Sequence, residues 1–338
     1  MNYKSVKIVI CFFLLSFFSC NSNPLEVNVE NQQVDLKIDR MEKDLFESKL
    51  PNMNETNRYL FQKYGSLYEV FVAKMIGEGS IHDPQIGARL QRFVSDSIIQ
   101  LIYTDIKHEF GDFTAYENEF KEAFKHYKYY FPDSLVPRLV TFYSNFNAKV
   151  FPANNTLAIG LDMYLGADNK SVQQIPPDVL PQFIKNDMEK KYLVADAMKY
   201  WLLNRFYNED TGDDFASKII ELGKIMYLLD AMLPHVSDDI KMNYTPEELL
   251  WVQQNENNIW KSLIDNKVLY TKNPMLINQY IVDGPFTKGL TSNSPSKVGI
   301  WVGWQIVRDY VEQNDVDVLS LLKEKNSIKI LKAYKHGK

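Results

Sequence analysis

The N-terminus is the feature that most constrains this chain. Two lysines precede an apolar run at residues 8–18, and Ser19 stands directly before Cys20. A basic region, an apolar stretch and a small residue at its end form the pattern of a secretory signal. The run of 11 residues is too short for a bilayer-spanning helix, which takes roughly 20. We therefore expect residues 1–19 to be a signal peptide that is removed during export.

Cys20, at the expected cleavage site, indicates a bacterial lipobox, in which the new N-terminal cysteine carries lipid. The usual lipobox has Leu three residues before the cysteine, whereas this chain has Phe17. An ordinary signal peptide with a chance cysteine is the alternative. Several acyl chains hold a protein stably at a membrane, since each buried methylene contributes about 0.8 kcal/mol. We expect the mature chain to be anchored by lipid, such as palmitate, on Cys20.

Cleavage leaves a body without cysteine, because Cys11 leaves with the signal and Cys20 carries the lipid. Disulfides and cysteine-based zinc sites are thereby excluded, so a hydrophobic core must stabilise the fold. Removing the two signal lysines leaves 36 basic and 43 acidic residues, a charge of −7, with no basic block. This balance argues against nucleic acid as a partner. We expect a flexible tether at 20–33 and a single globular domain at 34–338.

The apolar periodicity predicts an α+β fold that is mostly helical. The segments at 34–40 and 137–145 have strand character, and 149–166 predicts a hairpin with its turn near 152–155. Residues 171–181 hold three prolines and predict a loop. Apolar residues at a period of 3.6 predict helices at 56–76, 84–104, 116–130, 188–207, 211–232, 245–265 and 298–313. Thr-Pro-Glu-Glu at 245–248, with a capping Thr and Pro at the first helical position, predicts a helix start. A small central sheet thus lies between helical segments in the sequence.

No motif in the sequence supports known catalytic chemistry. The five histidines are at least 18 residues apart, and HExxH, the pattern by which a zinc peptidase binds its metal, is absent. GxSxG, GxGxxG and GxxxxGK[ST] are absent as well. We predict no catalytic residue, no metal site and no cofactor. Carboxylates on neighbouring predicted helices, Asp196 and Glu221, leave open a hydrolase with an unorthodox site.

Two tryptophan-bearing segments are unusual. Gly- and Pro-rich residues 281–297 form a long predicted loop, which is often functional in a compact domain. The following helix carries Trp301, Gly303 and Trp304. Packing is one interpretation, with Gly303 admitting a neighbouring helix; a cleft or partner surface is the other. Tryptophans also flank the polar residues 253–258, a pattern open to sugar or peptide binding through Trp251 and Trp260.

The whole mature chain resembles the GldB family of gliding-motility lipoproteins of the Bacteroidetes. The resemblance is carried, in order, by the Cys20 start, "LKIDRMEKDLF", "LAIGLDMYLG", "ELGKIMYLLDAMLP", "NENNIWKSLIDNKVLY" and "DGPFT…SPSKVGIWVGWQIVRDYV". It implies an envelope protein required for gliding, associated with adhesin-moving machinery that is coupled to type IX secretion. Other envelope proteins of this machinery are the implied partners.

The family is also distantly similar to predicted zinc-dependent peptidases, which implies a zincin-like scaffold. In those peptidases one helix carries HExxH and a later helix begins with Glu-Gly. The segment at 192–206 corresponds to the first helix and offers Asp196 without histidine, while 219–229 keeps Glu221. With two imidazoles missing, tight zinc binding is not expected. The candidate cleft residues are therefore Asp196, Glu221, Trp301 and Trp304.

The prediction is a non-catalytic gliding lipoprotein, anchored by Cys20 and facing the periplasm rather than the cell surface. The short Asn-Ser-Asn stretch after Cys20 carries no acid, and the family resemblance implies that surface display needs acids there. The alternatives are a hydrolase in the former peptidase cleft and an envelope module that binds glycan or peptide.

Overall fold

A four-stranded mixed sheet forms the centre of the molecule. The computed structural model describes residues 23–336, so the predicted signal peptide and Cys20 lie outside the described residues. The strand order is β1-β2-β4-β3, in which β1, β2 and β4 are parallel and β3 is antiparallel to β4. The strands are β1 (Ile38–Arg40), β2 (Arg138–Phe142), β3 (Val150–Ala153) and β4 (Thr156–Gly160).

The predicted strands and hairpin are confirmed, with one shorter strand. Asn154 has a φ of 52° and forms the β3–β4 turn within the predicted segment, because Asn tolerates left-handed backbone. Pro152 lies in β3, an edge strand, where its missing N–H costs no ladder bond. Only the last three residues of the predicted 34–40 strand pair with β2.

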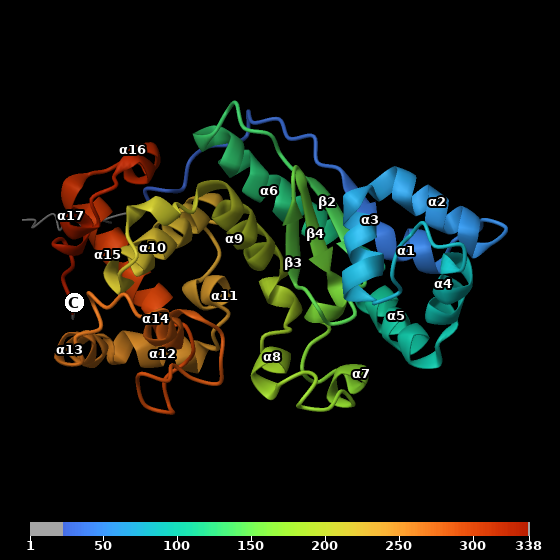
Figure 1. Cartoon of the computed structure of the whole chain (residues 1–338). Helices are drawn as coiled ribbons and strands as arrows, with labels where there is room; N and C mark the ends of the chain where they lie inside the picture. The colour runs from blue at the N-terminus through green and yellow to red at the C-terminus, as the bar shows by residue number, and fades with distance from the viewer. Residues whose placement is uncertain (1–22, 337–338) are drawn as a thin grey trace, which may run out of the picture.

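Helices cover the sheet from both sides, so β2 and β4 are buried beyond their first residue and do not alternate between buried and exposed positions. Every residue at 139–142 and at 157–160 is buried, as expected of a sheet with two covered faces. In Figure 1 the sheet lies between helices α1–α5 on one side and the helices of the C-terminal half on the other. The mostly helical α+β architecture is thus confirmed.

The N-terminal helices are shorter than the periodicity predicted. The predicted 56–76 helix breaks at Gly65, whose φ is 56°. The predicted 84–104 helix breaks at Asp96, whose carboxylate accepts hydrogen bonds from the N–H groups of Ile98 and Ile99 and so caps a new helix. The helices are α1 (Met41–Phe46), α2 (Met53–Tyr64), α3 (Ser66–Val70), the π-helix η1 (Phe71–Met75), α4 (Ile86–Ser95), α5 (Ser97–Phe110) and α6 (Thr114–Tyr130).

The C-terminal half is helical, as predicted. The predicted 171–181 loop includes most of α7, and the predicted 245–265 helix breaks at Asn255. Its elements are η2 (Leu161–Tyr164), α7 (Lys170–Gln173), α8 (Gln182–Asn186), η3 (Lys190–Tyr192), α9 (Leu193–Phe206), η4 (Glu209–Thr211), α10 (Phe215–Met232), α11 (Asp238–Met242), α12 (Pro246–Gln254), α13 (Glu256–Asp265), α14 (Pro274–Ile281), α15 (Val298–Asn314), α16 (Val318–Lys323) and α17 (Ser327–Leu331).

Helices α10 and α15 cross at two glycines. A Cβ at Gly303 would lie 1.8 Å from the carbonyl oxygen of Ile219, and a Cβ at Gly223 would lie 2.2 Å from the carbonyl oxygen of Gly303. Both distances are below any real carbon–oxygen contact, so the crossing requires glycine at both positions. The packing interpretation of Gly303 is confirmed.

The segment before β1 packs on the body although it forms no helix or strand. Leu25 and Val29 are buried, and the side-chain amide of Asn23 donates to the carbonyl oxygen of Pro234 at 3.2 Å. In Figure 1 this blue segment runs along the upper edge of the molecule before it enters β1. No helix among residues 23–336 is both long enough and apolar enough to cross a membrane.

Candidate functional site: a buried charge network around Asp196

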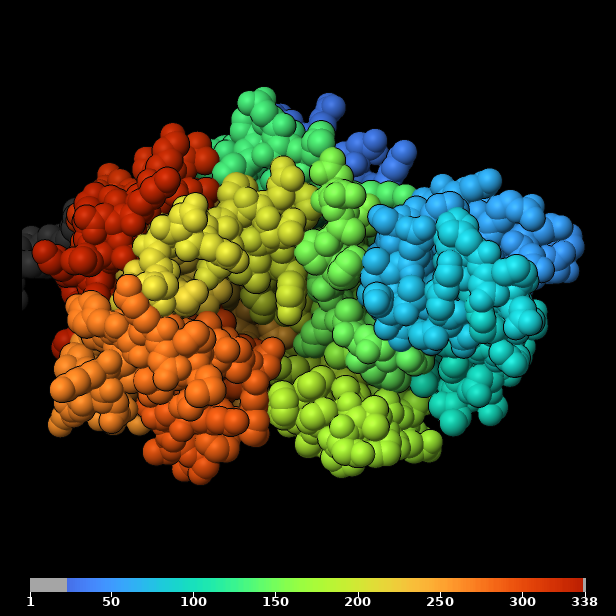
Figure 2. Space-filling model, viewed as in Figure 1, coloured from blue at the N-terminus to red at the C-terminus, as the bar shows by residue number. Residues whose placement is uncertain are grey.

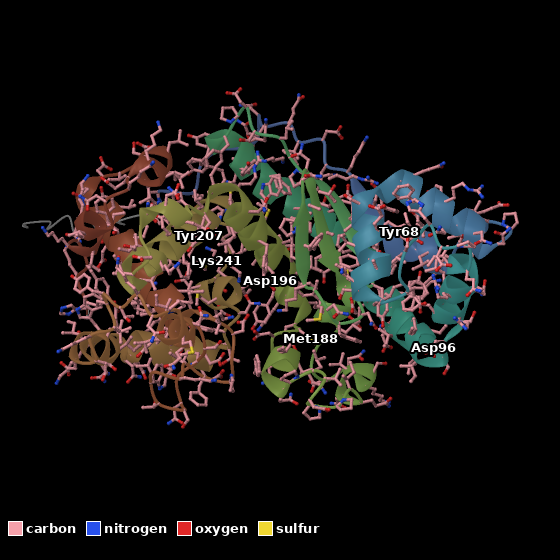
Figure 3. The ribbon with its side chains drawn as sticks, in the orientation of Figure 1. Tyr68, Asp96, Met188, Asp196, Tyr207 and Lys241 are labelled. Carbon is pink, nitrogen blue, oxygen red and sulfur yellow. The ribbon has the colours of Figure 1, made fainter. Side chains whose placement is uncertain are left out.

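Asp196 is a buried carboxylate on a helix whose neighbours are almost all apolar. Helix α9 packs against β3, α6 and α10, which explains why residues 193–198 are all buried. The surface is hollowed between the yellow helices, the orange C-terminal segment and the yellow-green segment that carries α8, as Figure 2 shows. Figure 3 places Asp196 at this hollow. The side chain of Asp196 is only 3% exposed, so its charge requires partners.

Two lysines and two neutral donors surround the Asp196 carboxylate. The Nζ atoms of Lys149 and Lys199 lie 3.3 and 3.1 Å from its oxygens. The amide of Asn243 donates at 3.0 Å and the hydroxyl of Tyr164 at 3.2 Å. Burial by itself raises the pKa of Asp196, but the Lys149 and Lys199 ammonium groups outweigh burial and hold that pKa well below its usual range. Asp196 is therefore an ionised structural partner and a poor proton donor.

Lys199 is held by more than its carboxylate partner. Its Nζ also donates to the side-chain oxygen of Asn243 at 3.0 Å and to the carbonyl oxygen of Lys241 at 3.3 Å. Burial lowers the pKa of Lys199, while the nearby Asp196 charge opposes that change. All three donor positions of the ammonium group are therefore used.

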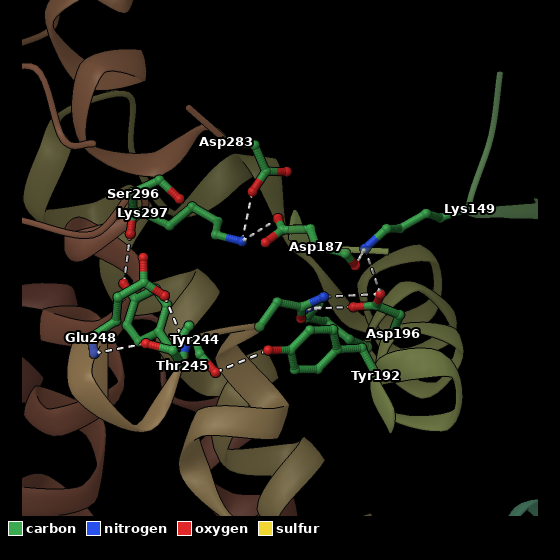
Figure 4. Close-up of polar contacts among 12 residues, drawn as sticks. Lys149, Asp187, Tyr192, Asp196, Tyr244, Thr245, Glu248, Asp283, Ser296 and Lys297 are labelled. Carbon is green, nitrogen blue, oxygen red and sulfur yellow. Dashed lines mark hydrogen bonds and ion pairs between the residues drawn. The ribbon is translucent and has the colours of Figure 1, made fainter. Parts of the chain in front are cut away.

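A third lysine joins the network from the start of α15. The Nζ of Lys297 lies 2.6 Å from Asp283 and 3.8 Å from Asp187, and the Nζ of Lys149 donates to the carbonyl oxygen of Asp187 at 2.5 Å. Lys297 has a φ of 58°, a strained conformation for a residue with a side chain, which persists only where its surroundings enforce it. Figure 4 shows Lys149 beside Asp196 and Lys297 beside Asp187 and Asp283.

Neutral hydrogen bonds join the helices that carry the charges. The hydroxyl of Tyr192 donates to the carbonyl oxygen of Tyr244 at 3.0 Å. The hydroxyl of Tyr244 in turn donates to the carbonyl oxygen of Ser296 at 2.6 Å. Directly after Tyr244, Thr245 and Glu248 form a capping box at the start of α12. These contacts, also visible in Figure 4, fix the starts of α9, α12 and α15 relative to one another.

Asp162 stabilises the loop at 143–149, which positions Lys149. Its carboxylate accepts hydrogen bonds from the backbone N–H and hydroxyl of Ser144, at 2.7 and 2.9 Å, and from the N–H of Phe146 at 2.5 Å. Asn145 and Phe146 both have a φ of 56°, so the loop turns sharply between β2 and β3. Burial raises the pKa of Asp162 to about 6, against these hydrogen bonds.

The structure does not bring the two predicted carboxylates into one site. Glu221 is buried on α10 and its carboxylate lies 2.5 Å from the Nζ of Lys224. That Nζ also donates to the carbonyl oxygen of Glu324. Asp196 and Glu221 share no partner, so they form separate structural ion pairs. Within residues 23–336, no three His, Cys, Asp or Glu side chains are grouped as metal ligands.

The predicted tryptophans divide into two groups. Trp301 and Trp304 are buried, and the indole N–H of Trp304 donates to Asp230 at 2.8 Å. They therefore belong to the core and cannot stack on a sugar from solvent. Trp260 is half-buried against Tyr334, and Trp251 lines a shallow groove of about 470 Å³.

Sequence reasoning missed the lysines of the network. One signal was present, because Lys199 follows Asp196 by three residues and therefore lies on the same helix face. Lys149 and Lys297 gave no such signal. Asp196 lies 47 residues after Lys149, and Asp283 and Asp187 lie 14 and 110 residues before Lys297. A charged residue in a loop carries no local pattern that distinguishes it from a solvated one.

Comparison with known protein families decides the relationship. The family model described as "Gliding motility protein GldB" matches residues 22–336, almost the whole chain. The chain belongs to the GldB family. The predicted resemblance is confirmed, and it places the chain among gliding-motility lipoproteins. No curated protein and no solved structure gives a match.

The GldB family match covers the residues of the charge network. It includes every segment that supplies the network, from the 143–149 loop to the start of α15. The charge network thus lies within the residues that match the GldB family. Asp283 and Lys297 lie at the two ends of the predicted Gly- and Pro-rich loop at 281–297.

Proposed function

We propose that this protein is a non-catalytic component of the gliding machinery, held at a membrane of the cell envelope by lipid on Cys20. The observation that carries the proposal is the closed charge network. Each charged group that α9 directs toward the hollow is already engaged by a partner within the protein. A catalytic acid or base needs a pKa near the working pH and access to substrate, whereas Asp196 is buried and its pKa is held well below its usual range.

We further propose a zincin-like scaffold whose catalytic centre is absent. Two features support this. Helix α9 packs beside β3, the antiparallel edge strand of a mixed sheet. In the peptidases that the family resembles, the corresponding helix carries HExxH, whereas α9 carries Asp196 and no histidine. The ammonium groups of Lys149 and Lys199 supply the positive charge beside Asp196.

The packed N-terminal segment supports close anchoring to the membrane. Leu25 is buried on the body and follows Cys20 by five residues. A fully extended chain covers at most 3.3–3.6 Å per residue, so five residues reach at most about 18 Å. Lipid on Cys20 holds the face that binds Leu25 close to the bilayer. We propose that this face looks toward the membrane and that the protein lies on the periplasmic side.

Deletion of the gene in the native bacterium, followed by complementation, tests the proposal. We expect deletion to abolish single-cell movement and the intact gene to restore it. Cys20→Ala should leave the protein without lipid label and in the soluble fraction, and should not restore movement. Cys11→Ala is the matched control, because Cys11 is removed with the signal peptide. Unlabelled Cys20→Ala protein that stays in the membrane fraction would overturn lipid anchoring.

The non-catalytic part of the proposal needs its own variants. Asp196→Asn and Glu221→Gln keep the shape of each side chain and remove its charge. At a growth temperature where both proteins accumulate to the wild-type level, we expect both to restore movement. Loss of movement by either protein at a normal level would contradict a purely structural role and favour hidden chemistry.

A further inference from the structure

A second concave surface lies on the other side of α9, away from the charge network. It is a groove of about 1060 Å³ bounded by α6, residues 26–30, the start of α9 and the segment that follows α10. Its floor is apolar and consists of Ala123, Val194, Ala195, Met232 and Leu233, all of them buried. The volume lies at the upper end of the roughly 300–1,000 Å³ that is typical of small-molecule pockets. A groove of this size suits a polymer segment.

The rim of the groove carries an excess of negative charge. Six carboxylates line it, against two lysines, Lys190 and Lys191. Of these carboxylates, Glu109 pairs with Lys190 at 2.8 Å and Glu122 with the neighbouring Lys125 at 2.6 Å. Glu119 has no side-chain partner among the described residues. The excess of carboxylates over lysines gives the rim a net negative charge, which attracts cations.

A buried imidazole without a partner lies on the same surface. His126, on α6, is 6% exposed and lines the groove. Its Nδ1 atom is buried and has no hydrogen bond within residues 23–336. The imidazole ring therefore forms part of the groove wall, while its Nδ1 atom is covered by the protein.

The backbone along one edge of the groove is also free. In the part of the chain that the structure describes, the N–H groups of Val27 and Asn28 form no hydrogen bond. An extended peptide laid beside such a segment gains main-chain hydrogen bonds, and its alternate side chains reach opposite sides.

We propose that this groove binds an extended segment of a partner protein in which apolar side chains alternate with lysine or arginine. The apolar side chains cover the floor, the basic side chains meet Glu119 and the other rim carboxylates, and a main-chain carbonyl accepts a hydrogen bond from the N–H of either Val27 or Asn28. An anionic lipid surface is a poor occupant, because the rim repels it. The inference does not depend on lipid at Cys20, so it stands or falls separately from the anchoring proposal.

A binding measurement with a defined probe tests this. The full-length protein is purified from its native bacterium in a neutral detergent, whether or not it carries lipid, and is titrated with the fluorescent peptide Lys-Val-Lys-Leu-Lys-Val-Lys, followed by anisotropy. The control peptide has Glu in place of each Lys. We expect saturable binding of the basic peptide and none of the acidic peptide.

Two groove variants and one matched control sharpen the test. Glu119→Lys reverses a rim charge, and Ala115→Trp fills the groove from an exposed position on α6. Each should weaken binding at least tenfold. Asp265→Lys makes the same charge change at an exposed position at the end of α13 and should change binding less than twofold.

Three outcomes would overturn the inference. One is the absence of saturable binding of the basic peptide. Another is equal weakening by Glu119→Lys and Asp265→Lys, which would mean that only net charge matters. The third is self-association of the protein that Ala115→Trp abolishes without any peptide binding, which would assign the groove to a second copy of this chain.

Discussion

Replacing Asp196 by Asn should destabilise the protein more than any other single charge removal in the network. The substitution keeps the shape of the side chain but leaves the ammonium groups of Lys149 and Lys199, now 3.3 and 3.1 Å from a carboxylate, without their shared counter-ion. At an effective dielectric constant of 20, one such pair has a Coulomb energy of about 5 kcal/mol. Most of that energy is offset by the cost of removing the charges from water.

Breaking a buried ion pair by removing one partner typically costs about 3–5 kcal/mol. The lower end applies here, because Lys199 keeps Asn243 and Lys149 keeps the carbonyl oxygen of Asp187. We expect Asp196→Asn to lower the free energy of unfolding by about 3 kcal/mol at pH 7. Urea denaturation, followed by tryptophan fluorescence and checked for an unchanged m-value, measures this.

The pH dependence and a double variant give independent checks. The folded pKa of Asp196 lies below its unfolded value, so its stabilisation is present above pH about 4 and is lost as the pH falls further. The difference between wild type and Asp196→Asn should therefore shrink below pH 4. Adding Lys149→Met should recover about 1 kcal/mol or more, because it removes one unpaired ammonium group. A loss below about 1 kcal/mol for Asp196→Asn at pH 7 would refute the reasoning.

Three further predictions concern stability and are measured by the same denaturation experiment. Gly303→Ala should lower the free energy of unfolding by about 2–4 kcal/mol, because the new Cβ would overlap the backbone of α10. Gly284→Ala is the control: the nearest atom to its Cβ lies at 3.5 Å, so the loss should be less than about 1 kcal/mol. Equal losses for the two variants would contradict the crossing geometry. Thr245→Ala removes a capping box and should cost about 1 kcal/mol, and a neutral result would show that the cap is redundant. Burial raises the pKa of Asp162 from 3.8 to about 6. The folded state therefore loses up to about 3 kcal/mol of stability through this carboxyl group as the pH rises from 4 to 6. Asp162→Asn should gain stability relative to wild type over that interval, and a constant difference between the two proteins would contradict the raised pKa.

Local patterns fixed much of the secondary structure. Pro-Ala-Asn-Asn at 152–155 predicted the β-hairpin, and Thr-Pro-Glu-Glu at 245–248 predicted the start of α12. Both signals act within a few residues, where backbone preference and side-chain hydrogen bonds dominate. The prediction failed at Gly65 and Asp96, where apolar periodicity continued across a helix break. Apolar periodicity shows which face of a segment is buried, but it does not show where a helix ends. Two consecutive helices that pack on the same core can keep the same spacing of apolar residues across the break.

The candidate site was predicted only in part. Asp196 was named as a carboxylate on a predicted helix and again through the family resemblance, but its pairing with Lys149 was not predicted. Glu221 proved to belong to a separate ion pair with Lys224. Trp301 and Trp304 were candidates for a cleft and are buried in the core. Aromatic residues on a helix give the same sequence pattern whether their partner is a ligand or a neighbouring helix.

The sequence by itself determined the mostly helical α+β class and the family, and it predicted an export signal, because each depends on residue types near one another or on the order of whole segments. Only the tertiary structure decided which charges are buried together. Three carboxylates meet three ammonium groups because β3, α9 and the start of α15 pack side by side. The carboxylates belong to Asp187, Asp196 and Asp283, and the ammonium groups to Lys149, Lys199 and Lys297. Burial converts charges that would be solvated in the separate segments into obligatory partners, and burial is a property of the folded chain as a whole.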